Sequence, residues 1–181
     1  MIPYNHRVST QCANGYCPMQ WDFGTGLSYT TFTYEAMKMS KTTVTGTSDS
    51  ITVSVKVTNS GKMAGMETVM LFVVQPYRSI SVPEVKQLKK FKKITLAPGV
   101  STTVEFKITA ADWSVFDPQI GSGFSQVAED GDFFVAIKPE TDCDVYGSPK
   151  GLDSLCGKFT LKTGVAPFAL EESMKSMKTD L

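Results

Sequence analysis

The residues that could carry out chemistry in this 181-residue chain are few and widely separated. A nucleophilic Ser-His-Asp triad needs a firmly held histidine as its general base. The single histidine, His6, lies in an irregular N-terminal segment. Gly24 and Gly26 lack the following lysine or third glycine, and the strand–turn–helix context, of a phosphate-binding loop. The sequence therefore predicts neither triad hydrolysis nor nucleotide binding, and it indicates no cofactor.

The four cysteines fall into two local pairs, Cys12 with Cys17 and Cys143 with Cys156. Zinc sites usually use C-x-x-C knuckles, which neither spacing matches, so we expect two disulfides, with zinc binding as the weaker alternative. On the chain-entropy model, closing the longer loop contributes about 3 kcal/mol and closing the shorter one about 2 kcal/mol. Because disulfides persist in oxidising compartments, the pairing predicts a secreted protein.

Targeting signals and charge narrow the class of protein further. The first seven residues hold no apolar signal-peptide region, and no apolar run approaches the length of about eighteen residues that spans a bilayer. An oxidised protein without its own signal is expected to be part of a longer secreted polypeptide. Eighteen basic and eighteen acidic residues give a net charge of zero, which offers no overall field to attract nucleic acid or an anionic membrane.

One local run, Lys86 to Lys93, is basic. Leu88, Phe91 and Ile94 interrupt it at positions that could face inward. Lysines are common on the outermost strands of sheets, where they prevent pairing with other chains. The run therefore favours a solvated strand edge over a polyanion-binding site.

Alternating apolar residues predict that most of the chain is β-strand. The clearest case is Ile51 to Val57, in which every second residue is apolar. Further strands are expected at Phe32–Met39, Glu67–Gln75, Leu88–Leu96, Val104–Ile108, Asp132–Ile137 and Lys158–Lys162. Short strands between turns, without a long helical pattern, indicate an all-β fold: a two-sheet antiparallel sandwich over residues 32–163. Residues 164–181 form a C-terminal tail, in which Leu170, Met174, Met177 and Leu181 allow either a short amphipathic helix or a frayed end.

The segment before the strands, residues 1–31, is expected to be an irregular linker that ends in a hinge. Its last part reads WDFGTGLSYTTF from Trp21 to Phe32, with aromatic residues on both sides of two glycines. Such a segment turns sharply and buries its rings against a neighbour. The residues expected to pack between domains are Trp21, Phe23, Gly24, Gly26 and Tyr29.

Several motifs together resemble one known family. FGTGLSYTTF at Phe23–Phe32, VKVTNSGKMAGMETVMLFV at Val55–Val73 and LKKFKKITLAPG at Leu88–Gly99 are similar to the C-terminal fibronectin type III-like domain of family-three glycoside hydrolases, the β-glucosidase and β-xylosidase group. AADWSVFD at Ala110–Asp117 and GDFFVAI at Gly131–Ile137 follow in the same order. The resemblance covers about residues 20–163, and it implies an immunoglobulin-like or fibronectin type III-like sandwich.

This resemblance implies a non-catalytic accessory domain of a secreted β-glucosidase-like hydrolase. In such enzymes the catalytic carboxylates come from upstream domains, which would be the partners of this chain. A catalytic barrel takes about 250 residues, so the chain by itself is not expected to be an enzyme. Asp112-Trp113 is similar to the Asp-Trp pair around the family's nucleophile, but it falls on the accessory domain's own turn motif. We expect Asp112 to cap a single turn and Trp113 to pack. The family usually has an aromatic residue where this chain has Thr25.

Aromatic side chains also suggest an alternative function, because exposed rings stack on the faces of sugars. Trp21 and Tyr29 are assigned to the interdomain contact, whereas Tyr77 and Phe124 lie in loops and are candidates for polysaccharide contact. The alternative is therefore a free-standing carbohydrate-binding or cell-surface interaction module.

Overall fold

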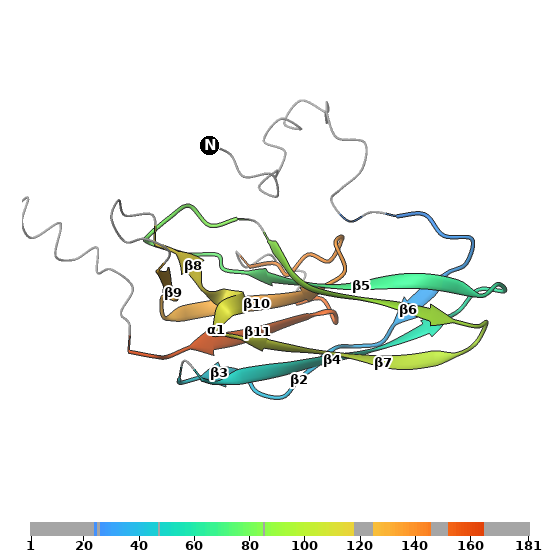
Figure 1. The fold of residues 1–181 in the computed structure, drawn as a ribbon, viewed down its shortest axis with the longest axis horizontal. Helices are drawn as coiled ribbons and strands as arrows, with labels where there is room; N and C mark the ends of the chain where they lie inside the picture. Colours follow the sequence, from blue (N-terminus) through green and yellow to red (C-terminus); the bar gives the residue numbers. More distant parts are fainter. Residues whose placement is uncertain are drawn as a thin grey trace, which may run out of the picture.

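The computed structural model describes residues 24, 26–46, 48–84, 86–117, 125–145 and 152–164, which form a sandwich of two β-sheets (Figure 1). One sheet contains β1 (Phe32–Tyr34), β2 (Lys38–Met39), β4 (Ser50–Asn59) and β7 (Ser101–Thr109). The other has the order β3 (Thr43–Val44), β11 (Cys156–Leu161), β10 (Gly131–Ile137), β5 (Gly65–Val74) and β6 (Gln87–Leu96). A helical turn and a two-stranded ribbon complete the described part: α1 (Ala110–Trp113), β8 (Val115–Phe116) and β9 (Gln126–Val127). No described helix is long and apolar enough to cross a membrane.

The all-β sandwich that the sequence predicts is confirmed, and most of the expected strands are present. One expectation was wrong: Phe32–Met39 is not a single strand but two short ones, β1 and β2, which both pair with β4. The chain leaves the ladder between them because the Met37 N–H donates to the Ser154 carbonyl, 3.0 Å away. Strands β3, β8 and β9 have two residues each, too few for an alternating pattern to reveal.

The core between the sheets follows directly from the alternation in β4. Its inward residues from Ile51 to Val57 are at most 2% exposed, while Thr52 and Lys56 face solvent. The facing sheet contributes Phe159, whose ring stacks on Phe133 at a centroid distance of 5.2 Å. Trp113 from α1 packs against Phe159 at 5.5 Å. Burial of these side chains is the main stabilising contribution to the fold.

A second apolar cluster lies on the outer face of the five-stranded sheet. It is formed by Phe72, Val74, Phe134, Ala136, Cys143 and Cys156. Cys143 and Cys156 form a disulfide, as the sequence predicts, with their Cα atoms 5.5 Å apart. The cluster explains why β5 and β10 have nearly continuous apolar runs instead of an alternation, since both faces of these strands are covered.

Strand β6 is the last strand of its sheet, in agreement with the edge position predicted for the lysine run. Leu88 packs against the outer cluster and Ile94 against the main core. The expectation that Phe91 faces inward was wrong, because this side chain is 69% exposed. The β5–β6 register shifts between Leu71 and Phe72, so Leu88 and Phe91 both lie on the outer face. Phe91 is opposite Met70, which packs against the second cluster.

Phe159 and Phe91 provide a matched test of this packing. Replacing the fully buried Phe159 by alanine is expected to lower the free energy of unfolding by about 3–5 kcal/mol, because a cavity opens between Phe133 and Trp113. Phe91→Ala removes the same atoms from an exposed site and should change stability by less than about 0.5 kcal/mol. Urea denaturation of both variants measures the difference; equal losses would contradict the assigned core.

Candidate interdomain surface

Asp112, whose sequence context is similar to that of the family's catalytic nucleophile, has a structural role in this chain. Its Oδ2 accepts a hydrogen bond from the Thr109 backbone N–H at 2.8 Å, and its Oδ1 pairs with Lys90 Nζ at 2.8 Å. Asp112 is 5% exposed and the neighbouring Trp113 is 3% exposed. Asp112 therefore closes the single turn of α1 and Trp113 packs, as expected. Asp112 is the third residue of the turn, and its side chain bonds back to Thr109, which is the N-cap residue.

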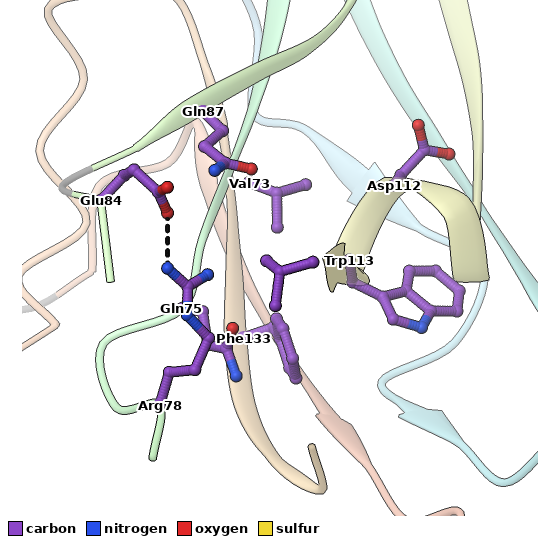
Figure 2. A pocket seen from close by; sticks show the side chains of 9 residues that line it. Val73, Gln75, Arg78, Glu84, Gln87, Asp112, Trp113 and Phe133 are labelled. Atoms are coloured by element: carbon purple, nitrogen blue, oxygen red, sulfur yellow. Dashed lines mark hydrogen bonds and ion pairs between the residues drawn. The ribbon is translucent and has the colours of Figure 1, made fainter. Parts of the chain in front are cut away.

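A small pocket lies beside α1, under the segment that follows β5 (Figure 2). It has room for about one water molecule, so a sugar ring does not fit inside it. Both of its carboxylates are paired, Glu84 with Arg78 and Asp112 with Lys90. Burial alone would raise the pKa of Glu84, but the hydrogen bond and charge of Arg78, a backbone hydrogen bond and a hydrogen bond from Gln87 together outweigh it and hold this pKa below its usual range. The pocket therefore lacks the space for the sugar ring in glycoside hydrolysis, and both of its carboxylates are engaged in ion pairs.

The part of the hinge that the structure describes contacts the five-stranded sheet (Figure 1, blue). Gly24 has a φ of +87°, and a Cβ there would lie 2.7 Å from Pro139 and 3.1 Å from the Met70 sulfur. Only glycine allows both this conformation and this close approach. A Cβ on Gly26 would contact nothing within 4 Å, so no steric contact in the described structure requires a glycine there.

A buried asparagine fixes the hinge at its other end. The Asn59 side chain is fully buried, and its Oδ1 accepts from the Thr30 hydroxyl at 2.7 Å and from the Gly61 N–H at 3.0 Å. Its Nδ2 donates to the carbonyls of Met63 and Leu96, at 2.8 and 2.9 Å. All four hydrogen-bonding positions of the amide are used. One side chain thereby joins the hinge, the turn after β4 and the end of β6.

Between these two fixed points, the hinge presents apolar side chains to solvent. Leu27 is 91% exposed and Tyr29 is 97% exposed. On the sheet face that Gly24 contacts, Met66 and Phe91 are 59% and 69% exposed. We call these four residues the apolar surface. Large exposed apolar side chains, when they form a contiguous patch, mark sites of contact with another protein surface.

A polar cluster supports Pro139, on which Gly24 rests. The Tyr34 hydroxyl donates to Glu67 at 2.7 Å, and Lys138 lies over the Tyr34 ring, with its Nζ 5.0 Å from the ring centroid. Lys138 also pairs with Glu140. Burial, and then the hydrogen bond to Glu67, raises the pKa of Tyr34 far above its usual value, so this phenol stays neutral. The cluster holds the loop after β10 against β1.

The predicted site residues divide into three groups. Outside the described residues lie Trp21, Phe23, Phe124, Cys12 and Cys17. The tail from Leu170 to Leu181, for which a short helix and a frayed end were both left open, also lies outside them. Gly24, Gly26 and Tyr29 lie together on the hinge, and their contact with another domain remains a prediction. Tyr77 is 75% exposed in the segment after β5. Sequence reasoning missed the role of Asn59, although the Asn59-Ser60-Gly61 turn motif was its visible signal.

Comparisons with known proteins identify similar chains. Residues 67–141 match the family model described as fibronectin type III-like domain. The chain is 38% identical over 122 residues to a β-xylosidase of Formosa agariphila, covering 67% of this chain and 16% of that enzyme. It is 42% identical over 115 residues to thermostable β-glucosidase B of Acetivibrio thermocellus, covering 64% of this chain and 15% of that enzyme. A mutant β-glucosidase structure from Listeria innocua matches with 26% identity and a TM-score of 0.64, covering 91% of this chain and 22% of that one. The chain thus spans about a sixth of the length of these curated relatives.

The amide of Asn59 can be tested by an isosteric change. Asn59→Asp removes the two N–H donors and places a carboxylate opposite two carbonyls, so we expect the free energy of unfolding to fall by about 3 kcal/mol. Ser60→Ala is the control, because Ser60 is exposed and bonds to Thr31 at the surface. Urea titration at neutral pH compares the two; a difference below about 1 kcal/mol would contradict the anchoring role.

Tyr34 predicts a pH effect with a definite sign. Because its pKa is raised in the folded state, its stabilising contribution is complete below the ordinary tyrosine pKa of about 10 and is lost as the pH rises further. The native protein should therefore lose stability between about pH 9 and 11 more steeply than Tyr34→Phe. Burial lowers the pKa of Lys89, which makes the free energy of unfolding rise with pH in the same range. This contribution is the same in the native protein and in Tyr34→Phe, so it does not affect the comparison. Parallel curves from denaturant midpoints would contradict the assignment.

Proposed function

Residues 67–141 belong to the fibronectin type III-like domain family, and on that basis we propose that the chain is a non-catalytic accessory domain of a secreted β-glucosidase-like hydrolase. The named relatives are a β-xylosidase and a β-glucosidase, and this chain matches only the fibronectin type III-like part of them. The proposed partners are the catalytic domains of the same hydrolase. The Cys143–Cys156 disulfide supports secretion, since such bonds are rare in reducing compartments.

The observation that carries this proposal is the exposure of Leu27 and Tyr29 on an anchored segment. Gly24 is in close contact with Pro139, and Thr30 is held by Asn59, so anchored residues lie on both sides of Leu27 and Tyr29. Holding two apolar side chains in water in this way is unfavourable unless another surface covers them. In the proposed hydrolase, that surface belongs to a catalytic domain.

The electrostatics of the described residues agree with an architectural role. A general acid for glycoside hydrolysis needs a carboxyl group whose pKa is raised. Five described carboxyl groups have a pKa clearly below its usual value: Asp49, Glu84, Asp130, Asp132 and Glu140. These groups are held ionised by hydrogen bonds or ion pairs. The proposed contribution of the domain is to support and orient its catalytic neighbours.

A chimera tests the proposal directly. This chain replaces the matching region of the Acetivibrio thermocellus β-glucosidase, and hydrolysis of an aryl β-glucoside and thermal inactivation are measured. We expect an active chimera, whereas the chain by itself should show no turnover. The double change Leu27→Ser with Tyr29→Ser should speed inactivation of the chimera at least about fivefold but leave the unfolding midpoint of the isolated chain unchanged.

Tyr77→Ser is the matched control in the chimera, since it alters another largely exposed tyrosine, which lies in the segment after β5 and not on the hinge. Equal inactivation rates for the double variant and this control would overturn the interdomain assignment. Turnover by the isolated chain, abolished by a single carboxylate substitution, would overturn the accessory role.

A further inference from the structure

We infer that residues 75–84, which follow β5, form a surface that binds a neutral polysaccharide. This segment is called the loop below. This loop follows Val74, at the opposite end of β5 from Gly65, which lies next to the hinge. It is therefore separate from the apolar surface, and its function does not depend on the proposed interdomain contact. The inference rests on how the loop is held, what it exposes and which charges it lacks.

A buried arginine holds the loop from inside. The Arg78 side chain is 4% exposed and forms an ion pair with Glu84, with Nη2 and Oε2 2.8 Å apart (Figure 2). The same guanidinium group donates to the carbonyls of Ser81 and Val82, at 3.3 and 2.8 Å. Arg78 thus bonds to three other residues of its own loop, which curves around the guanidinium group.

A second buried charge joins this loop to the segment before β10. Glu129 is 5% exposed, and its Oε2 accepts from the Ser79 backbone N–H at 2.8 Å. Its other oxygen accepts from the Ser79 hydroxyl. The loop is therefore ordered before any ligand arrives. Since ordering is completed on folding, a ligand does not have to offset that entropy when it binds.

The outside of the loop presents apolar side chains. Tyr77 and Val82 are each 75% exposed. On the neighbouring ribbon, Phe116 is 58% exposed, and its neighbour Val115 lines the same pocket as Arg78. Two exposed aromatic residues beside an ordered loop are the elements that stack on the C–H faces of sugar rings. The hydroxyl groups of Ser79 and Ser81 lie in the same loop.

Charge and size define the class of ligand. Within residues 75–84, the charged residues are Arg78 and Glu84, and they neutralise each other. The next lysine, Lys86, donates to the carbonyls of Pro139 and Thr141. Residues 75–84 themselves therefore carry no uncompensated cation for a polymer of sugar acids, and an uncharged glycan fits them better. The pocket beneath holds no more than about a water molecule. The ligand must lie along the surface, which suits a polymer rather than an enclosed monosaccharide.

The test is binding of the full chain to insoluble cellulose and insoluble xylan, with affinity electrophoresis in hydroxyethylcellulose as the soluble assay and polygalacturonate as the charged comparison. We expect retention by at least one neutral polymer, and Tyr77→Ala should weaken it at least about fivefold. Tyr29→Ala, which removes a 97% exposed tyrosine at the hinge, is the matched control and should bind normally.

Ser79→Ala separates ordering of the loop from its contacts. This change removes one hydrogen bond to Glu129 and leaves Tyr77 in place, so it should also weaken binding while the circular dichroism spectrum stays native. Absence of binding to every neutral polymer would overturn the inference, as would equal losses in Tyr77→Ala and Tyr29→Ala or preferential binding to polygalacturonate. None of these outcomes bears on the chimera, so failure here is distinguishable from failure of the proposed accessory role.

Discussion

The buried amide of Asn59 fixes the position of the hinge relative to both sheets. An asparagine without solvent contact is stable only if its two donors and two acceptor positions are all used, because an unsatisfied buried group costs about 1–3 kcal/mol. Meeting that condition brings the hinge, the turn after β4 and the end of β6 to one point. The position of Thr30, which bonds to Asn59, also requires glycine at two nearby residues. A Cβ at Gly61 would lie 2.1 Å from the Thr30 hydroxyl oxygen, and one at Gly65 would lie 2.5 Å from its methyl group.

Much of the fold could be predicted because the longer strands that are buried on one face alternate apolar and polar residues. In β4 the alternation from Ile51 to Val57 gives both the strand and its inward face. What the sequence could not reveal depends on register and on distant contacts. Phe91 turns outward because of an irregularity in the β5–β6 pairing, and the break between β1 and β2 follows a bond from Met37 to Ser154. Neither the pairing irregularity nor the Met37–Ser154 hydrogen bond can be predicted from the residue types nearby in the sequence.

The candidate site was predictable to a similar degree. The glycines and aromatic residues around Gly24 predicted a close contact, and Tyr77 was recognised as an aromatic residue in a loop. The groups that hold these residues were not visible, since Pro139 lies more than a hundred residues from Gly24 and Glu129 lies fifty residues from Ser79. Asn59 shows the difficulty clearly. Its sequence context indicates a turn, and the turn is real, but the same context does not reveal that the amide is buried.

Strand β5 has a consequence for geometry at a larger scale. It is covered on both faces over its second half, by the main core and by the disulfide-closed cluster, and it connects the hinge end of the domain to the loop around Arg78 without an intervening flexible segment. Ten residues of extended chain measure about 33 Å. The strand therefore acts as a spacer of fixed length. In the proposed hydrolase, a polymer bound to the loop would stay at a constant distance from the proposed interdomain contact, and the length of one strand would set that distance.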